Sequence, residues 1–198
     1  MRVTILDYGA GNLHSLAKAL DDGASAVRVE PDPIAALDTD VLVLPGVGAF
    51  GHAAARLASA RLAIRDAIHG GLPCVGICLG MQLLFTESDE GDGAGLGVIG
   101  GRVTRVRARR VPHIGWAMIA DANDWAFERA PLDVAYYANG FACRPARPDV
   151  VRAWSVHESD RFPAMVREGS AVGVQFHPEK SSRAGVAFLR ALIGEVHS

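Results

Sequence analysis

Residues 73–80 read Pro73-Cys74-Val75-Gly76-Ile77-Cys78-Leu79-Gly80, and the helical pattern Met-Gln-Leu-Leu-Phe follows at 81–85. The short apolar run predicts a buried strand, and a Gly-x-Cys-x-Gly turn between strand and helix is the cysteine form of a nucleophile elbow. The two glycines permit a sharp turn and close backbone packing. Such a turn lifts Cys78 to the carboxyl edge of a sheet, where the dipole of the next helix favours the thiolate. A cysteine that ends a buried strand is often only a small hydrophobic residue, so this stretch alone leaves both interpretations open.

Outward from this stretch, strands and helices alternate. Strand-like runs lie at 2–6, 26–30, 41–44 and 73–77, and helix-like stretches lie at 13–22, 52–69, 80–86 and 183–193. The middle of the chain changes to short strand-like segments at 102–106, 114–119, 134–139, 151–156 and 164–167. The pattern predicts an α/β fold, with a mainly parallel central sheet flanked by helices and an antiparallel β extension. We expect one domain over 1–198, with glycine-rich 91–101 as a loop between its halves.

A second candidate for chemistry lies at 173–180, Gly-Val-Gln-Phe-His-Pro-Glu-Lys. An apolar strand ends here, because Pro178 cannot donate a hydrogen bond to a neighbouring strand. In extended chain, His177 and Glu179 share a face. A carboxylate in that position fixes the tautomer of an imidazole and stabilises the imidazolium. Together with Cys78, the two residues predict a set of nucleophile, base and orienting group.

Five blocks of the sequence carry a resemblance to a known family: 7–13, 44–50, 73–82, 112–116 and 173–181. On these blocks the chain resembles the class I (triad) glutamine amidotransferases over nearly its whole length. The cysteine and His-Pro-Glu blocks are common to that superfamily. The blocks at 8–12, 45–50 and 113–116, with Lys180, resemble more narrowly the glutaminase subunits of imidazole glycerol phosphate synthases, from histidine biosynthesis.

The resemblance implies a Cys-His-Glu glutaminase that hydrolyses L-glutamine to glutamate and ammonia. Cys78 attacks the side-chain amide, His177 transfers the protons and Glu179 holds His177. The oxyanion needs preorganised N–H donors. A loop with two glycines can flip its peptide, which is a possible on/off device. The oxyanion donors are expected from Leu79 and from the loop Gly46, Val47 and Gly48.

Substrate contacts also follow from the resemblance. Relatives often carry His-Ser where this chain has Asn-Gly at 139–140, and an asparagine where it has Ala117. These departures concern the chemistry of the pocket, not the class of enzyme. The residues expected to bind glutamine are Gly48, Gln82, Asn139, Gly140 and Phe141.

The resemblance also implies a partner, a (β/α)₈-barrel cyclase subunit. The heterodimer would pass ammonia to a ribotide and make imidazole glycerol phosphate and an aminoimidazole carboxamide ribotide. Each expected interface residue also fits an ordinary core or surface role. The interface residues are expected to be Asn12, His113, Trp116 and Lys180. The other histidines are expected to be structural or on the surface: His14, His52, His69, His157 and His197.

Composition agrees with this class without identifying it. Nearly half of the 198 residues are apolar and the net charge is −2, so nothing indicates a nucleic-acid or membrane partner. Residues 1–6 are predicted to be a first strand, not a signal peptide. Three cysteines, an odd number, fit a reducing cytoplasm better than a disulfide framework. We expect the arginines at 102, 105, 107, 109 and 110 to form a solvated strand face.

We expect neither a metal nor a cofactor. Cys74 and Cys78 fit a strand and its turn better than a zinc site, and no second pair lies at ligand spacing. The glycines at 9–11 follow a first strand, but His14 stands at the third glycine position of a dinucleotide fingerprint, and the glycines at 91–97 precede a strand rather than a helix. Two alternatives stay open from the sequence: a glutaminase of this superfamily that feeds ammonia to another acceptor, and a silent subunit that keeps only the fold.

Overall fold

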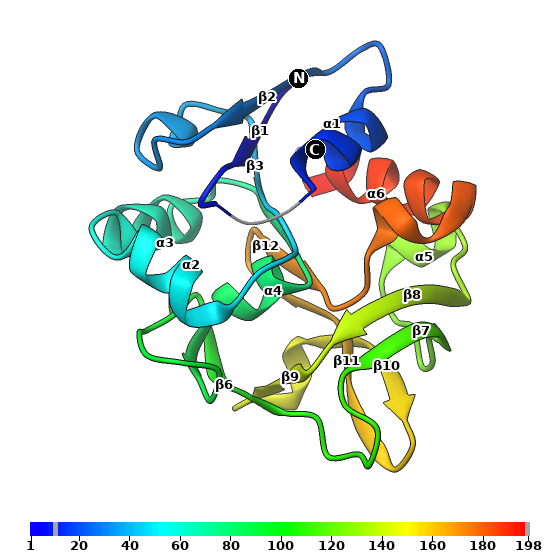
Figure 1. Cartoon of the computed structure of the whole chain (residues 1–198). Helices are drawn as coiled ribbons and strands as arrows, with labels where there is room; N and C mark the ends of the chain where they lie inside the picture. The colour runs from blue at the N-terminus through cyan, green and yellow to red at the C-terminus, as the bar shows by residue number, and fades with distance from the viewer. Residues whose placement is uncertain (10–11, 197–198) are drawn as a thin grey trace.

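The computed structural model describes residues 1–9 and 12–196 (Figure 1). The block at 7–13 is therefore described in part, and the expectation for His197 lies outside the described residues. A seven-stranded sheet forms the centre, in the order β10-β11-β12-β4-β3-β1-β2. Its strands in chain order are β1 (Arg2–Leu6), β2 (Ala26–Glu30), β3 (Val41–Leu44), β4 (Cys74–Ile77), β10 (Val151–His157), β11 (Asp160–Glu168) and β12 (Ala171–Val174).

The sheet is parallel from β12 to β2, and β11 and β10 extend it antiparallel. Strand β3 shows why it is central: Val41 and Val43 pack into one core, and Leu42 and Leu44 pack into the other. A strand that is apolar on both faces is typical of a parallel sheet covered on both sides. The predicted, mainly parallel central sheet is confirmed.

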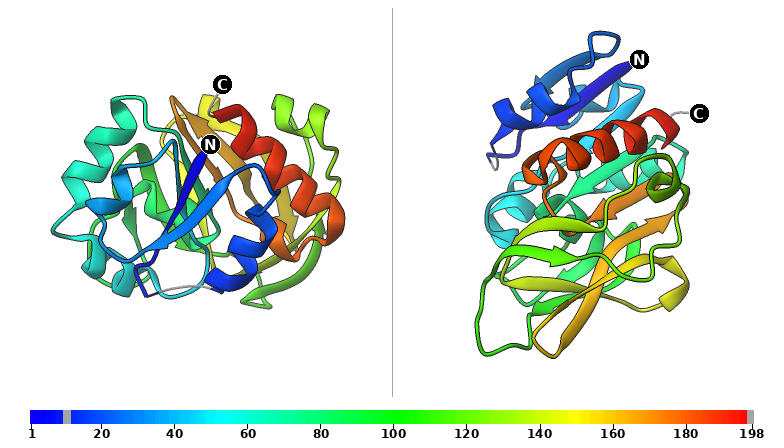
Figure 2. Two further views of the ribbon diagram at one scale, coloured as in Figure 1. Left: turned by 90° about the horizontal axis from the view of Figure 1, so that it is seen from above. Right: turned by 90° about the vertical axis from the view of Figure 1, so that its right-hand side faces the viewer.

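Helices cover both faces of this sheet (Figure 2). Helices α1 (Leu13–Leu20) and α6 (Ser182–Val196) lie on one face, and α2 (Phe50–Leu57) and α3 (Arg61–His69) lie on the other. The short helices are α4 (Leu79–Leu83), α5 (Trp125–Arg129), η1 (Ala35–Leu37), η2 (Pro148–Val150) and η3 (Pro178–Lys180). Each face thus has its own apolar core, and the sheet backbone between them is rigid.

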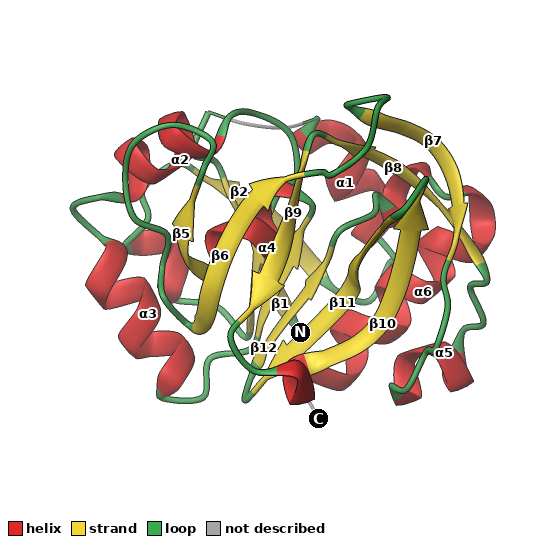
Figure 3. Ribbon diagram, turned by 90° about the horizontal axis from the view of Figure 1, so that it is seen from below, coloured by secondary structure: helices red, strands yellow, loops and turns green. Residues whose placement is uncertain are grey.

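Two small sheets lie beside the central one (Figure 3). The first has the order β5-β6-β9 and the second pairs β7 with β8. All pairings in them are antiparallel except β5 with β6. Their bounds are β5 (Phe85–Ser88), β6 (Ile99–Arg105), β7 (His113–Met118), β8 (Val134–Asn139) and β9 (Phe141–Pro145). This is the predicted antiparallel extension.

Two predicted helices differ from the observed elements. The stretch 52–69 is two helices, because the chain turns at 58–60 and both helices then lay their apolar sides on the same core. The stretch 80–86 stops being helical at Leu83, and Phe85 is instead fully buried in β5, opposite Ile99 of β6. The predicted loop at 91–101 ends earlier, where β6 begins. Strand β9 and helix α5 were not predicted.

The sheet brings three loops to one edge. Strands β3, β4 and β12 are adjacent and parallel, so their carboxyl ends share that edge. The loop at 45–49 follows β3, Cys78 follows β4, and the segment 175–181 follows β12. Sites in open α/β sheets lie outside the carboxyl ends of such strands. Among the described residues, no helix has the length and apolar character needed to cross a membrane.

Candidate active site

Cys78 has the backbone of a nucleophile elbow. It joins β4 to α4 with φ 50° and ψ −102°. Residues other than glycine rarely adopt a backbone conformation with positive φ. The elbow closes because both flanking glycines lie against backbone. A Cβ at Gly76 would lie 2.5 Å from the carbonyl oxygen of Gly80, and one at Gly80 would lie 2.0 Å from that of Leu44. The predicted turn is confirmed, and its strain is of the kind that gathers at functional sites.

His177 and Glu179 form the predicted pair. Nδ1 of His177 lies 2.9 Å from Oε1 of Glu179, and both side chains are buried. Nε2 of His177 has no hydrogen-bond partner of ordinary geometry among the described residues, and Cys78 is its neighbour. Burial alone disfavours the imidazolium, but the interactions with Cys78 and Glu179 outweigh it and raise the pKa of His177 to about 9. The cysteine, the imidazole and the carboxylate are therefore coupled.

Ser181 fixes the backbone around His177, and sequence reasoning missed it. Its hydroxyl donates to the carbonyl of His177 at 2.7 Å and accepts the N–H of Tyr136 at 2.9 Å. The N–H of His177 in turn donates to the carbonyl of Tyr136 at 2.8 Å. Ser181 is fully buried, so these bonds are shielded from water. The only sequence signal for this role was a serine directly after the turn.

The loop at 45–49, the predicted oxyanion loop, contacts the elbow in the structure. The N–H of Leu79 donates to the carbonyl of Gly46 over 3.5 Å, so a carbonyl oxygen occupies that donor. Tyr8, which is buried, donates its hydroxyl hydrogen to the carbonyl of Pro45 and anchors the start of the loop. Gly48 has φ +136°, which favours glycine. The expected oxyanion donor of Leu79 is therefore occupied by the chain itself in this conformation.

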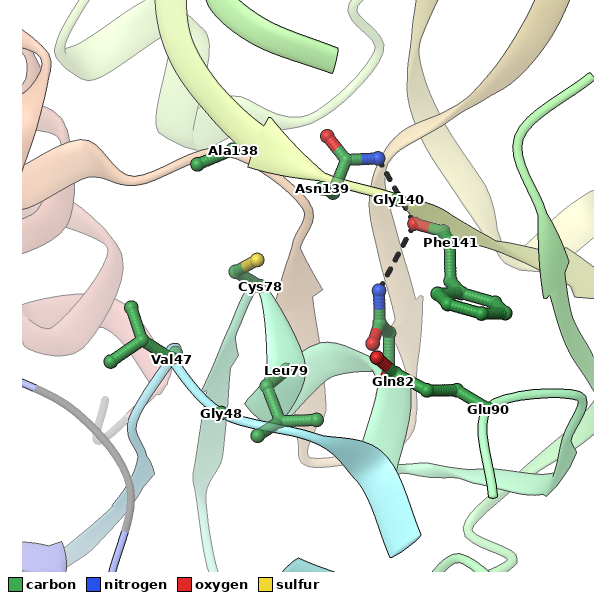
Figure 4. Close-up of a pocket in the computed structure, with 11 residues that line it drawn as sticks. Val47, Gly48, Cys78, Leu79, Gln82, Glu90, Ala138, Asn139, Gly140 and Phe141 are labelled. Atoms are coloured by element: carbon green, nitrogen blue, oxygen red, sulfur yellow. Dashed lines mark hydrogen bonds between the residues drawn. The ribbon is translucent and has the colours of Figure 1, made fainter. Parts of the chain in front are cut away.

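A cavity of about 150 Å³ lies in front of Cys78 (Figure 4). Every residue predicted for the oxyanion and for glutamine binding lines it. Gln82 donates its Nε2 to the carbonyl of Phe141 at 3.1 Å, and Asn139 donates its Nδ2 to the same oxygen at 3.0 Å. The lining residues are Gly46, Val47, Gly48, Cys78, Leu79, Gln82, Glu90, Ala138, Asn139, Gly140 and Phe141.

Glu90 is a lining residue that sequence reasoning missed. Its carboxylate accepts the N–H of Phe50 at 3.2 Å, and burial raises its pKa. Glu90 lies in a loop rich in glycine and acidic residues, so the local sequence does not distinguish it from its neighbours. Only the fold brings this loop back beside helix α4, which follows the elbow. Oδ1 of Asn139 is a second acceptor, buried and without a partner among the described residues. Glu90 and Asn139 thus each bring a hydrogen-bond acceptor to the residues that line the cavity.

The four predicted interface residues lie outside this cavity. Asn12 caps α1, with its side-chain oxygen accepting the N–H of Ser15 at 3.2 Å, and Lys180 is exposed on η3. Helix η3 packs against both α1 and β8. Trp116 is 55% exposed on β7. These three residues belong to neighbouring surface elements.

His113 differs from that expectation because its side chain is buried. Its ring stacks on Tyr137 and on His157, with centroids 5.1 and 4.2 Å apart. Burial, and then the neighbouring His157, lower the pKa of His113 to about 4. Its ring therefore supports β7 from within and does not itself reach the surface.

The five arginines are exposed, as predicted, but the strand face is only partly present, because β6 ends at Arg105 and the arginines at 107, 109 and 110 lie in the loop that follows. Arg102 lies on β6 and pairs with Asp89 at 2.6 Å and with Glu87. Among the residues that the structure describes, no group of three or more histidine, cysteine or acidic side chains could hold a metal ion.

Comparison with known proteins agrees with this geometry. The family model described as glutamine amidotransferase class-I matches residues 4–192. Imidazole glycerol phosphate synthase subunit HisH of Symbiobacterium thermophilum is 42% identical over 95% of this chain and 91% of that protein. Subunit HisH 2 of Prochlorococcus marinus is 38% identical over 96% of this chain and 92% of that protein.

Solved structures share the fold. PurLQS from Thermotoga maritima matches with a TM-score of 0.75 and 20% identity, over 98% of this chain and 97% of that chain. A crystal structure of glutamine amidotransferase matches with a TM-score of 0.75 and 18% identity, over 96% and 98%. The sequence relatives narrow the assignment further than the fold does. The chain belongs to the class I glutamine amidotransferases and, within them, to the HisH subunits of imidazole glycerol phosphate synthase.

Proposed function

We propose that this chain hydrolyses L-glutamine through the triad Cys78, His177 and Glu179, and supplies the ammonia to a cyclase subunit in histidine biosynthesis. One observation carries the proposal: an elbow cysteine and a buried histidine–carboxylate pair meet at the ends of adjacent parallel strands, in front of a cavity. The names of the relatives support the pathway.

The chemistry follows from the coupled cysteine and histidine. Cys78 attacks the side-chain amide carbon as a thiolate, and the thiol proton resides on His177, whose raised pKa suits the ion pair. The tetrahedral intermediate collapses as the imidazolium protonates the departing ammonia, which leaves a γ-glutamyl thioester. Neutral His177 then takes a proton from water, and the hydroxide equivalent releases glutamate and the cysteine. Glu179 keeps the ring oriented in each step.

The substrate ammonium fits the acceptors of the cavity. Both hydrogens of the Gln82 amide are used, by Phe141 and by Gln175, so its free atom is the oxygen. That oxygen, Oδ1 of Asn139 and the carboxylate of Glu90 are all acceptors. A cationic α-amino group with three hydrogens can bond to such a set. We therefore add Glu90 to the proposed glutamine contacts, with Gly48, Gly140 and Phe141 supplying backbone groups.

The closed oxyanion hole predicts low basal activity. For the N–H of Leu79 to meet an oxyanion, the carbonyl of Gly46 must turn away, and the same rotation would bring in the N–H of Val47. Oxyanion donors contribute factors of about 10²–10³ to the rate. Docking of the partner and its ribotide is the proposed trigger.

The proposed docking surface is the outer face of β7 and β8. Ile114, Trp116 and Met118 alternate along β7, so they share a face, and they are 65%, 55% and 70% exposed. Their partners across the sheet include Val134, also exposed. A row of large exposed apolar residues is typical of an interaction surface. Lys180 lies on η3, which packs against β8 and against α1, the helix that Asn12 caps. Lys180 makes no side-chain ion pair with any other described residue, so it can pair with a carboxylate of the partner.

The test is glutamate release from glutamine by the chain with its genome-encoded barrel cyclase, with and without the ribotide ligand. We expect ligand-stimulated release that disappears in Cys78→Ala. Glutamate release that does not depend on the cyclase or the ligand would support the glutaminase activity but indicate another ammonia acceptor. No release under any condition, from a folded chain, would favour the silent subunit. Three buried free cysteines support a reducing compartment such as the cytoplasm.

A further inference from the structure

Gln175 is a fully buried amide beside the triad that the mechanism above does not use. It follows β12 directly, and its backbone N–H donates to the carbonyl of Ala164 on β11 at 2.9 Å. Residues two apart in extended chain share a face, so Gln175 and His177 direct their side chains to the same side of the sheet. Gln175 is therefore held on rigid backbone next to the catalytic histidine.

Both ends of the Gln175 amide bond to active-site side chains. Its Nε2 donates to Sγ of Cys78 over 3.5 Å, and its Oε1 accepts Nε2 of Gln82 at 3.3 Å. A buried amide without partners costs about 1–3 kcal/mol, so a buried glutamine must be bonded. Here its two partners are the nucleophile and a glutamine-binding residue.

The neighbours fix which end of the amide faces the sulfur. The carbonyl of Phe141 can only accept, so the Gln82 amide must turn its nitrogen toward it. The second hydrogen on that nitrogen then goes to the oxygen of Gln175. Gln175 is left with N–H toward Cys78. A thiolate can only accept, and a hydrogen bond to a charged acceptor is stronger than one to a neutral acceptor.

We propose that Gln175 is a positioning residue that holds the Cys78 sulfur as a thiolate with its N–H and holds Gln82 with its carbonyl. One side chain then sets the distance between nucleophile and substrate-binding amide. The inference rests on the proposed glutaminase function for its catalytic meaning. Among the described residues, the other titratable groups around Cys78 are His177 with its partner Glu179, Glu90 on the lining of the same cavity, Tyr8 and Cys143. Burial raises the pKa of Tyr8 and that of Cys143, so both stay neutral at pH 7.

The test is the pH dependence of Cys78 alkylation by iodoacetamide in the free chain, which needs neither glutamine turnover nor a partner. Gln175→Met keeps the length of the side chain without an N–H donor, and Gln175→Glu keeps its shape with a carboxylate in place of the donor. We expect Gln175→Met to be alkylated about tenfold more slowly at pH 7, with the midpoint about one pH unit higher. A larger change is expected for Gln175→Glu. Cys78→Ala gives the background from the fully buried Cys74 and Cys143.

The matched control is Ser155→Ala, which removes another fully buried side-chain hydrogen bond, 2.9 Å to the carbonyl of Met118. It is expected to lower the melting temperature without moving the alkylation profile. If both Gln175 variants keep the wild-type profile, whatever their melting temperatures, the inference is overturned, and either variant suffices if the other fails to fold. A shifted profile in a chain that releases no glutamate would uphold the inference and count against the proposed function.

Discussion

The backbone N–H of Leu79 is bonded to the carbonyl oxygen of Gly46, 3.5 Å away, although Leu79 follows the nucleophile and is the expected oxyanion donor. The two residues follow the neighbouring parallel strands β3 and β4. A rotation of the Gly46 peptide therefore frees or covers the N–H of Leu79. A longer bond than the usual 2.9 Å is weak, which suits a contact that must break in each activation.

Gly46→Ala should abolish most of the ligand-stimulated activity. A Cβ at position 46 would lie 2.6 Å from the carbonyl oxygen of Ile77, and backbone cannot move aside. The loop must then shift away from the hole, and we expect glutamate release to fall by about 10²–10³-fold, as for loss of an oxyanion donor. Steady-state glutamate release with cyclase and ribotide measures this.

The control for that variant is Gly194→Ala in α6, where a Cβ would meet nothing within 4 Å. Alanine favours a helix over glycine by about 1 kcal/mol, so this variant should keep full activity and be at least as stable. Full activity in Gly46→Ala would show that the loop at 45–49 does not supply the hole.

Replacing Cys78 by glycine should give a more stable chain than replacing it by alanine. The elbow holds residue 78 at φ 50°, which costs a residue with a Cβ about 1 kcal/mol and costs glycine little. Urea unfolding of Cys78→Gly and Cys78→Ala should differ by about that amount. At the exposed position Ala63 on helix α3, Ala63→Gly should have the opposite sign, a loss of about 1 kcal/mol. Equal stability of the two Cys78 variants would mean that the elbow is not strained.

His177 should titrate near pH 9 in the folded chain, and lower in Glu179→Gln. Because its folded pKa lies above the unfolded value of about 6.5, the stability that its charge contributes is complete below pH 6.5 and is lost as the pH rises through 9. The advantage of wild type over Glu179→Gln, about 1–3 kcal/mol, should therefore shrink between those pH values. NMR of the imidazole, assigned with His177→Asn, and urea unfolding measure the two effects. A titration at 6.5 in both chains would exclude the coupling.

His113 should have the opposite effect on the pH dependence of stability. Its folded pKa of about 4 lies below the unfolded value, so the unfolded chain binds more protons and stability falls as the pH drops from about 6.5 to 4. His113→Phe keeps an aromatic ring for the stack and cannot take a proton. We expect its unfolding free energy to fall less over that range, by on the order of 1–3 kcal/mol. Exposed His69→Asn serves as the control and should follow wild type.

Trp116→Ala should weaken binding of the barrel cyclase by about 2 kcal/mol, or about 30-fold, because large aromatic residues dominate interfaces. Titration calorimetry with the cyclase measures this. Leu62→Ala is the matched control, since Leu62 is exposed to a similar degree, 51%, on helix α3, which is not part of the proposed docking surface. Equal binding of the cyclase by wild type, Trp116→Ala and Leu62→Ala would mean that the docking surface lies elsewhere.

Much of the fold was determined by local sequence. The bounds of β1, β2, β3 and β8 were predicted without error, because apolar runs between turn residues have few other stable arrangements. The elbow at Cys78 and the turn at Pro178 were also predicted, since glycine permits and proline restricts the conformation of the adjacent backbone. The one long helix predicted at 52–69 and the end of α4 were wrong because tertiary packing, not local propensity, decided where those helices stop.

The site divides in the same way. The sequence by itself predicted Cys78, His177 and Glu179 as a triad, since each lies in a motif whose backbone geometry is local, and the resemblance to the family predicted the oxyanion loop and Gln82. Only the tertiary structure decided that Glu90 lines the cavity and Gln175 bonds to Cys78, that His113 is buried, and that the carbonyl of Gly46 accepts the N–H of Leu79. These features depend on distances between segments far apart in the chain, which are set by strand order and packing and leave no local pattern.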